Sequence, residues 1–271
     1  VYYALKCIGL YMKDMRSMLL TELRTLFQSD CDALVSFHGA TYREGQVAVV
    51  LEYLNLGGLE GIMAKAGPIP EHVLACMAYQ VLWALGYLAY ERRIHRDIKP
   101  ANILVDTSGN VKLTDFGISR EMQTAMLAKT FVGTFKYMAP ERISGMEYDY
   151  ASDLWSFGLV ILEAALGHYP YPESKSTVPA VPEDGSFTPQ FKEFIEGVLV
   201  KDPKKRLTPA QLLDSEWMLR HGCDSLEGCA EVVAGWLAEK GFKSDIPTAA
   251  EIAAEGKDSD PSDAAGSESK K

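Results

Sequence analysis

Aromatic and branched side chains dominate residues 1–10, which predicts a β-strand at the start of the chain. Apolar positions then recur every three to four residues from residue 15 to residue 27, the period of an amphipathic helix. Two further strands are predicted at 34–42 and 46–53, joined by a short turn. Together these segments predict a small β-rich unit that carries one helix.

The pattern becomes helical after the glycine pair at 57–58. Pro70 marks the start of a long helix, because proline is favoured in the first turn, where its missing N–H costs nothing. Short strands are predicted at 102–105 and 111–113, and a strongly apolar helix at 153–166. This second unit is therefore larger and mainly helical.

We predict an α+β fold of two lobes, a smaller β-rich one and a larger helical one, within one domain at 1–220. A ligand is expected in the cleft between the lobes. An amphipathic helix follows, and the last residues have almost nothing apolar to bury, so they are expected to be disordered. The predicted boundaries are 1–53 for the smaller lobe, 52–57 for the hinge, 58–220 for the larger lobe, 221–245 for the helical extension and 246–271 for the tail.

Charge and composition exclude several classes of function. The formal net charge of −10 argues against a nucleic-acid partner, because such proteins need basic patches that release counterions. The five cysteines are scattered and include no CxxC pair, so neither a disulfide framework nor a zinc site is expected. The longest apolar stretches fall short of the roughly 20 residues of a membrane span. We expect a cytoplasmic protein without a membrane span.

The strongest chemical signal is the segment His-Arg-Asp-Ile-Lys-Pro-Ala-Asn at 95–102, followed by Asp-Phe-Gly at 115–117. Phosphoryl transfer from ATP depends on positioning and on charges that meet the phosphate oxygens and their Mg²⁺ ions. Asp97 is the candidate base for the acceptor hydroxyl, and Lys99 would neutralise the γ-phosphate. Asn102 and Asp115 supply the oxygen ligands that Mg²⁺ prefers.

Two residues near the start of the chain complete this constellation. Lys6, near the end of the first strand, would bind the α- and β-phosphates of ATP. Glu22 would hold Lys6 in place through an ion pair, and it is preferred over Asp14 because it lies in the middle of its helix. Each residue is weak evidence alone. A protein kinase is indicated because both residues precede the two later motifs and Ala-Pro-Glu at 139–141 in the order that a kinase requires.

The chain more closely resembles one kinase family, the mitogen-activated protein kinase kinases, which have dual specificity. The resemblance extends over roughly residues 1 to 242. It is carried by Glu-Leu-Arg-Thr-Leu at 22–26, Phe-His-Gly-Ala at 37–40, Thr-Phe-Val-Gly-Thr at 130–134, Tyr-Met-Ala-Pro-Glu-Arg at 137–142, Ser-Asp-Leu-Trp-Ser-Phe-Gly-Leu at 152–159 and Ala-Gly-Trp-Leu at 234–237.

The resemblance implies transfer of the ATP γ-phosphate to Thr and Tyr in the activation loop of a downstream MAP kinase, after activation by an upstream MAP kinase kinase kinase. It also implies that Asp153 braces the catalytic loop and that Glu141 pairs with Arg206. Thr134 would lie in the segment that meets the substrate. The residues implied around the adenine ring are Leu51 as gatekeeper, Glu52 and Leu54 in the hinge, and Ala4 and Leu104 on the two faces of the ring.

Arg96 is a cation beside the candidate base, and a phosphorylated threonine of the activation loop is its natural partner. Thr124 and Thr130 are the candidates. Five residues separate them, which is similar to the spacing in plant-type members of the family.

The chain departs from the family pattern before Lys6, where only five residues precede it. A glycine-rich loop that covers the phosphates is expected two strands earlier, so the smaller lobe reads as truncated, starting at the lysine-bearing strand. We expect weak ATP binding by such a chain. Three interpretations remain open: an excerpt of an active kinase kinase, an upstream-tier Ser/Thr kinase of the same cascade, and a catalytically inactive binding or scaffold protein. The intact catalytic set favours the first.

Overall fold

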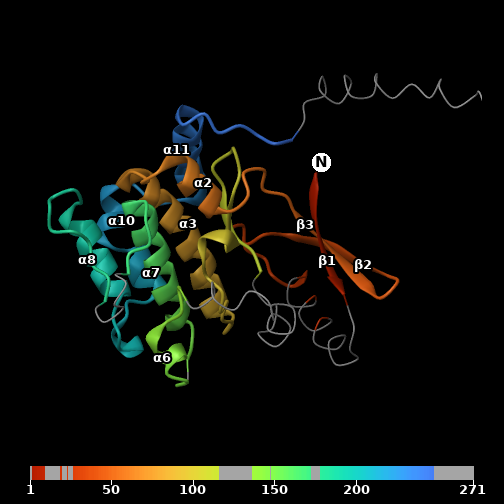
Figure 1. Ribbon diagram of the computed structural model, residues 1–271, viewed down its shortest axis with the longest axis horizontal. Helices are drawn as coiled ribbons and strands as arrows, with labels where there is room; N and C mark the ends of the chain where they lie inside the picture. The colour runs from red at the N-terminus through yellow and green to blue at the C-terminus, as the bar shows by residue number, and fades with distance from the viewer. Residues whose placement is uncertain are drawn as a thin grey trace, which may run out of the picture.

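The molecule consists of a small antiparallel sheet beside a larger helical body, with a two-stranded hairpin between them (Figure 1). This arrangement confirms the predicted α+β fold of a small β-rich part and a larger α-rich part. The computed structural model describes residues 2–9, 19, 23, 27–115, 136–146, 148–171 and 178–246.

The small sheet contains β1 (Tyr3–Gly9), β2 (Phe37–Arg43) and β3 (Gln46–Glu52) in the order β1-β3-β2, with both pairings antiparallel. Its alternating side chains bury a small core around Ile8 and Val49. The second strand begins at Phe37, three residues later than the sequence pattern predicts. Leu34 instead forms a single parallel bridge with Leu113, which connects this segment to the hairpin of the larger part.

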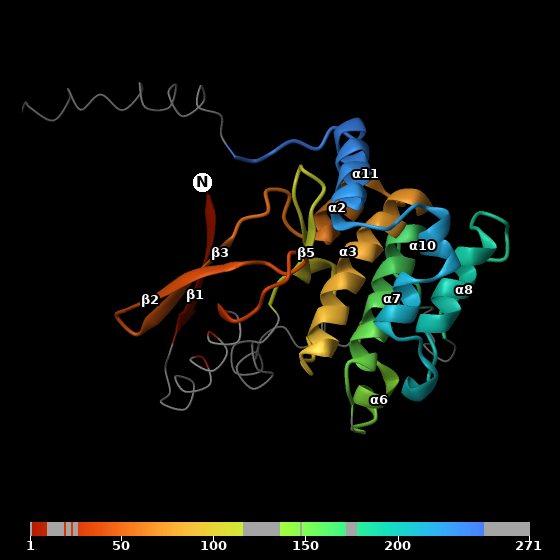
Figure 2. The same cartoon turned by 180° about the vertical axis from the view of Figure 1, so that it is seen from behind.

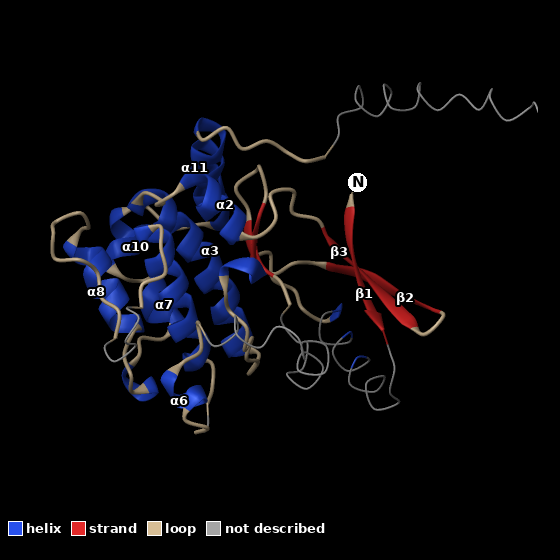
Figure 3. Ribbon diagram, viewed as in Figure 1, coloured by secondary structure: helices blue, strands red, loops and turns tan. Residues whose placement is uncertain are grey.

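The helical body is built around α3 and α7, which lie side by side in both views (Figures 1 and 2). Both helices are apolar on nearly all sides, because the other elements of the larger part surround them (Figure 3). The elements are α2 (Leu59–Ala66), α3 (Glu71–Tyr90), η1 (Pro100–Asn102), β4 (Ile103–Val105), β5 (Val111–Leu113), α6 (Pro140–Ile143), α7 (Ala151–Leu166), α8 (Pro189–Val198), η2 (Pro203–Lys205), α9 (Pro209–Leu213), α10 (Glu216–Arg220) and α11 (Leu226–Glu239).

Helix α3 is long and apolar enough to cross a membrane by length and composition alone, with a mean hydropathy of 1.5. In this fold 72% of that window is buried inside the protein. A core helix of a water-soluble domain passes the same test, so α3 is weak evidence for a span. The absence of a membrane span stays a prediction.

The predicted helical extension contains α11, which packs against α3 and against the turn between β4 and β5. Ser225 caps its start by accepting a hydrogen bond from Gly228 N. After the helix ends, the Lys65 ammonium lies 4.2 Å from the centre of the Phe242 ring. The tail that the sequence predicts to be disordered lies outside the described residues from 247 onward.

Gly109 in the β4–β5 turn explains how closely α11 approaches. Its φ of +81° lies in the left-handed region that favours glycine. A Cβ atom at this position would lie 2.0 Å from the Ala230 carbonyl oxygen of α11. Glycine therefore allows the turn to touch the helix backbone.

Candidate active site

The segment between α3 and η1 is fixed by the buried carboxylate of Asp153, at the start of α7. His95 N donates to Asp153 Oδ2 at 2.7 Å, and Arg96 N donates to Asp153 Oδ1 at 2.8 Å. Burial raises the pKa of Asp153, and the facing His95 and the two backbone N–H groups oppose that rise. Arg96 has a φ of +72°, a left-handed conformation that these hydrogen bonds help to hold. The predicted bracing role of Asp153 agrees with this geometry.

His95 and Arg142 anchor the same loop from its other sides. His95 is buried, and its Nε2 lies 2.8 Å from the Thr114 carbonyl oxygen next to Asp115. Arg142 Nη1 donates to the Arg96 carbonyl oxygen at 2.7 Å. The loop is thus connected both to the end of β5 and to α6.

Two of the predicted catalytic side chains converge on the carboxylate of the third, Asp97. Lys99 Nζ lies 2.7 Å from Asp97 Oδ2, and Asn102 Nδ2 donates to the same oxygen at 2.9 Å. Asn102 Nδ2 also donates to the Asp97 carbonyl oxygen at 2.7 Å. Asn102 is held at the end of η1, where its own carbonyl oxygen accepts from Thr114 N at 3.0 Å. Asp97 is therefore oriented by two neighbours and stays partly accessible.

Lys6 and Asp115 meet from opposite parts of the molecule. Lys6 Nζ on β1 lies 2.5 Å from Asp115 Oδ1, and each side chain is about one-third exposed. Asp115 adopts a left-handed φ of +64° immediately after the β5 strand and Thr114. Glu22, the predicted partner of Lys6, lies outside the described residues. The predicted phosphate-binding cation and the predicted metal ligand consequently face the same space.

The predicted adenine-binding residues lie where the small sheet joins the larger part. Ala4 and Leu51 are directly opposed in the antiparallel register of β1 and β3, so they share one face of the sheet. Leu54 is buried just after β3, and Leu104 lies on β4, where it bridges Gly58. Their placement brings four apolar positions to the junction between sheet and hairpin.

The Glu52 side chain has a contact that the sequence does not reveal. Its carboxylate lies 2.8 Å from Lys112 Nζ on β5 and accepts from Ser36 N at 3.1 Å. This ion pair ties the end of β3 to the hairpin of the larger part. No motif spacing links positions 52 and 112, so only the fold brings them together.

Glu141 and Arg206 form a buried ion pair, as the resemblance implies. Arg206 Nη1 and Nη2 lie 2.6 and 2.8 Å from the two carboxylate oxygens of Glu141, a bidentate geometry. Ser152 Oγ donates to Glu141 Oε1 at 2.6 Å. The pair joins the start of α6 to the segment after η2, and its role is structural.

Several predicted site residues are outside the part of the chain that the structure describes. They are Glu22, the candidate phosphorylation sites Thr124 and Thr130, and Thr134 of the predicted substrate segment.

Comparison with known proteins agrees with the resemblance found in the sequence. The family model of the protein kinase domain matches residues 1–218. The chain is 41% identical over 233 residues to mitogen-activated protein kinase kinase 3 of Arabidopsis thaliana, a match covering 80% of this chain and 45% of the relative. It is 40% identical over 236 residues to mitogen-activated protein kinase kinase 1 of the same plant, covering 80% and 67%. Against mitogen-activated protein kinase kinase 1c of Physcomitrium patens, identity is 36% over 242 residues, covering 82% and 70%. The chain thus spans from about half to about two-thirds of these relatives.

Proposed function

Because the chain belongs to the protein kinase domain family, and within it to the mitogen-activated protein kinase kinases, we propose that it transfers the γ-phosphate of ATP to threonine and tyrosine hydroxyls in the activation loop of a downstream MAP kinase. The observation that carries this proposal is the convergence of Lys99 and Asn102 on the Asp97 carboxylate. The Lys6–Asp115 contact is linked to this group because Thr114, the residue before Asp115, donates its N–H to the Asn102 carbonyl oxygen.

Asp97 is the base in this proposal. Its carboxylate accepts the hydrogen bond of the acceptor hydroxyl, aims the oxygen in line with the phosphorus, and takes the proton as the new bond forms. Lys99 and Asn102 restrict the rotation of Asp97, so little reorganisation is needed when the substrate arrives. In this proposal the Lys99 ammonium, which contacts Asp97, would neutralise the charge of the transferring phosphoryl group.

The donor set fits a magnesium ion. Asn102 uses Nδ2 for both of its bonds to Asp97, which leaves the amide oxygen Oδ1 as a neutral ligand. Asp115 offers an anionic oxygen, and Mg²⁺ prefers a few protein oxygens together with phosphate oxygens and water. When bound, Mg²⁺–ATP supplies the phosphoryl group and screens its charge. Lys6, in contact with Asp115, would bind the α- and β-phosphates.

Regulation by phosphorylation of Thr124 or Thr130 is part of the same proposal. Its support is Arg96, whose buried Nε has no hydrogen-bond partner in the described part of the chain. An unpaired buried guanidinium nitrogen is costly, and a phosphate is a strong acceptor for it. An upstream MAP kinase kinase kinase would be the modifying enzyme. Thr130→Ala is expected to lower the activity strongly after treatment with that enzyme, whereas undiminished activity would contradict a role for Thr130.

We also place the protein in the cytoplasm. This proposal rests on the five cysteines, all of them within the described residues and none in a disulfide, which suits a reducing compartment. Immunolocalisation of the tagged protein tests it, and a location in an oxidising compartment would contradict it.

A mapping experiment separates the proposed activity from its alternatives. The protein, treated with an upstream kinase, is incubated with Mg²⁺–ATP and a catalytically inactive MAP kinase, and the phosphorylated residues are identified by mass spectrometry. We expect phosphate on both Thr and Tyr of the activation loop. Phosphate on Thr or Ser alone would support an upstream-tier Ser/Thr kinase, and no incorporation would support a binding or scaffold role.

A further inference from the structure

Three buried cysteines meet in the larger part of the molecule, away from the candidate active site. Cys76 lies on α3, Cys223 in the connection between α10 and α11, and Cys229 in the first turns of α11. Their three Sγ atoms lie within 4.8 Å of one another, and those of Cys76 and Cys223 are 3.9 Å apart. The residues are only 2%, 5% and 1% exposed. Three separate elements thus bring their thiols to one point.

The spacing of these thiols matches what a tetrahedral thiolate site requires. A Zn–S bond of 2.3 Å at tetrahedral angles places two sulfur ligands about 3.8 Å apart. The 3.9 Å between Cys76 and Cys223 agrees with that value, and Cys229 needs at most a small adjustment to reach the same distance. A disulfide would use only two of the three sulfur atoms, whereas a metal ion would use all of them.

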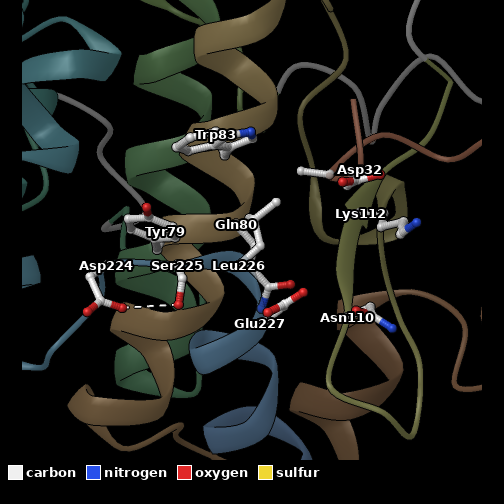
Figure 4. A pocket seen from close by; sticks show the side chains of 11 residues that line it. Asp32, Tyr79, Gln80, Trp83, Asn110, Lys112, Asp224, Ser225, Leu226 and Glu227 are labelled. Atoms are coloured by element: carbon white, nitrogen blue, oxygen red, sulfur yellow. Dashed lines mark hydrogen bonds between the residues drawn. The ribbon is translucent and has the colours of Figure 1, made fainter. Parts of the chain in front are cut away.

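A cavity of about 570 Å³ is lined by residues of α3 and of the segment between Cys223 and Cys229 (Figure 4). Its lining includes Asp224 and Glu227, which lie in sequence between Cys223 and Cys229, and Tyr79, one turn of α3 beyond Cys76. Asp32 adds a third carboxylate and Lys112 an ammonium, so the wall keeps a net negative charge that would attract a cation towards this side of the molecule.

A partly buried histidine lies shortly before one of these cysteines in the chain. His221 precedes Cys223 by two residues, and its Nε2 is buried without a hydrogen-bond partner in the described part of the chain. That nitrogen lies 3.8 Å from Glu71 Oε2. The segment that leads into Cys223 therefore carries an imidazole, a group that commonly orients or completes a metal centre.

We propose that Cys76, Cys223 and Cys229 form a three-thiolate site for a thiophilic cation of the Zn²⁺ type. The site would clamp α11 and the segment before it to α3, the helix that leads directly into the loop carrying Asp97. Soft thiolate ligands select such ions over Mg²⁺, so this site is chemically distinct from the Asn102 and Asp115 oxygens. The sequence gives no hint of it, because the ligands come from distant segments without a CxxC pair.

The test measures metal on the whole, unmodified chain. The reduced protein is stripped with a chelator, incubated with Zn²⁺, desalted into metal-free buffer, and its zinc content measured by atomic emission. We expect one zinc ion per chain. In parallel, Co²⁺ should give the near-ultraviolet charge-transfer absorption of thiolate ligation, and bound Zn²⁺ should protect Cys76, Cys223 and Cys229 from alkylation while Cys7 and Cys31 still react.

Matched variants assign the ligands. Cys76→Ser and Cys229→Ser are each expected to weaken Zn²⁺ binding at least about 10-fold, in line with the sensitivity of metal sites to lost ligand contacts. Cys31→Ser, which leaves the cluster intact, should bind like the unmodified chain. The proposal would be overturned if Cys76→Ser and Cys229→Ser bound zinc as well as the unmodified chain, or if all five cysteines were alkylated in the presence of Zn²⁺. Recovery of a disulfide among the three residues from protein that holds no metal would overturn it as well.

Discussion

Lys6 Nζ lies 2.5 Å from Asp115 Oδ1, although the two residues are 109 positions apart in the chain. Lys6 belongs to the small sheet, and Asp115 follows the hairpin of the larger part. Their contact joins the two lobes at the place where the phosphates of ATP are proposed to bind. A cation and a carboxylate that face each other here are suited to bind a phosphate and its metal ion, respectively.

Removal of the Lys6 charge should impair catalysis more than folding. Lys6→Met is expected to lower kcat/KM for ATP by about 100-fold or more, since a preorganised charge aimed at the transferring group is worth that much. Because the pair with Asp115 is about one-third exposed, the melting temperature should change little. Lys201→Met, at an exposed position, is the matched control and should retain full activity. Equal kinetics for the two variants would contradict the proposed role.

The Glu141–Arg206 pair should make stability depend on pH. Burial raises the pKa of Glu141, but hydrogen bonds from Arg206 and Ser152 outweigh this effect and hold the pKa below its usual value of 4.5. The carboxylate therefore contributes stability that is fully present above pH 4.5 and is lost as the pH falls through the lower pKa of the folded state. Glu141→Gln is expected to cost about 3 to 5 kcal/mol at pH 7, because it leaves Arg206 buried without its counter-charge.

Urea unfolding at pH 7 and at stepwise lower pH checks this expectation. The difference between the unmodified protein and Glu141→Gln should shrink as the solution becomes more acidic. Glu183→Gln removes a surface partner of Lys192 and should leave the unfolding curve almost unchanged at every pH, because a solvent-exposed pair contributes little. A constant difference between the Glu141→Gln and unmodified curves would show that the pair does not set the acid dependence.

Alanine substitutions at two glycines with nearly the same φ can separate the cost of backbone strain from the cost of a steric clash. Gly109 and Gly45 have φ values of +81° and +83°, so alanine is strained at both. Only at Gly109 would the new methyl group collide with another element, the Ala230 carbonyl of α11. Gly109→Ala should therefore lower the free energy of unfolding by about 1 to 3 kcal/mol more than Gly45→Ala. Equal losses would mean that α11 can move away from the turn without cost.

The proposed catalytic residues could be named from the sequence because most of them are close together in the chain. Asp97, Lys99 and Asn102 lie within one short loop, so their convergence follows from local geometry. The order of motifs along the chain assigned Lys6 and Asp115 to one site, but the sequence predicted Glu22 as the partner of Lys6 and not the contact with Asp115. The start of α3 followed from the Pro70 signal, and the end of α7 at residue 166 followed from the extent of the apolar pattern.

Other features depend on tertiary contacts that no local pattern records. The Glu52–Lys112 ion pair joins residues 60 positions apart, and neither residue belongs to a motif. The three buried thiols come from α3, α11 and a connecting segment, so their spacing in sequence carries no signal. The second strand started later than predicted because Leu34 bridges to β5 instead of continuing the sheet.

The most direct test of the proposed activity compares two chemically identical substitutions. Asp97→Asn removes the proposed base, and Asp30→Asn makes the same change at an exposed residue outside the site. After treatment with an upstream kinase, each protein is assayed for the initial rate of phosphate transfer from ATP to a catalytically inactive MAP kinase. We expect Asp30→Asn to match the unmodified protein and Asp97→Asn to be slower by about 100-fold or more, the contribution of a positioned base. Equal rates for all three proteins, or no transfer by any of them, would contradict the account.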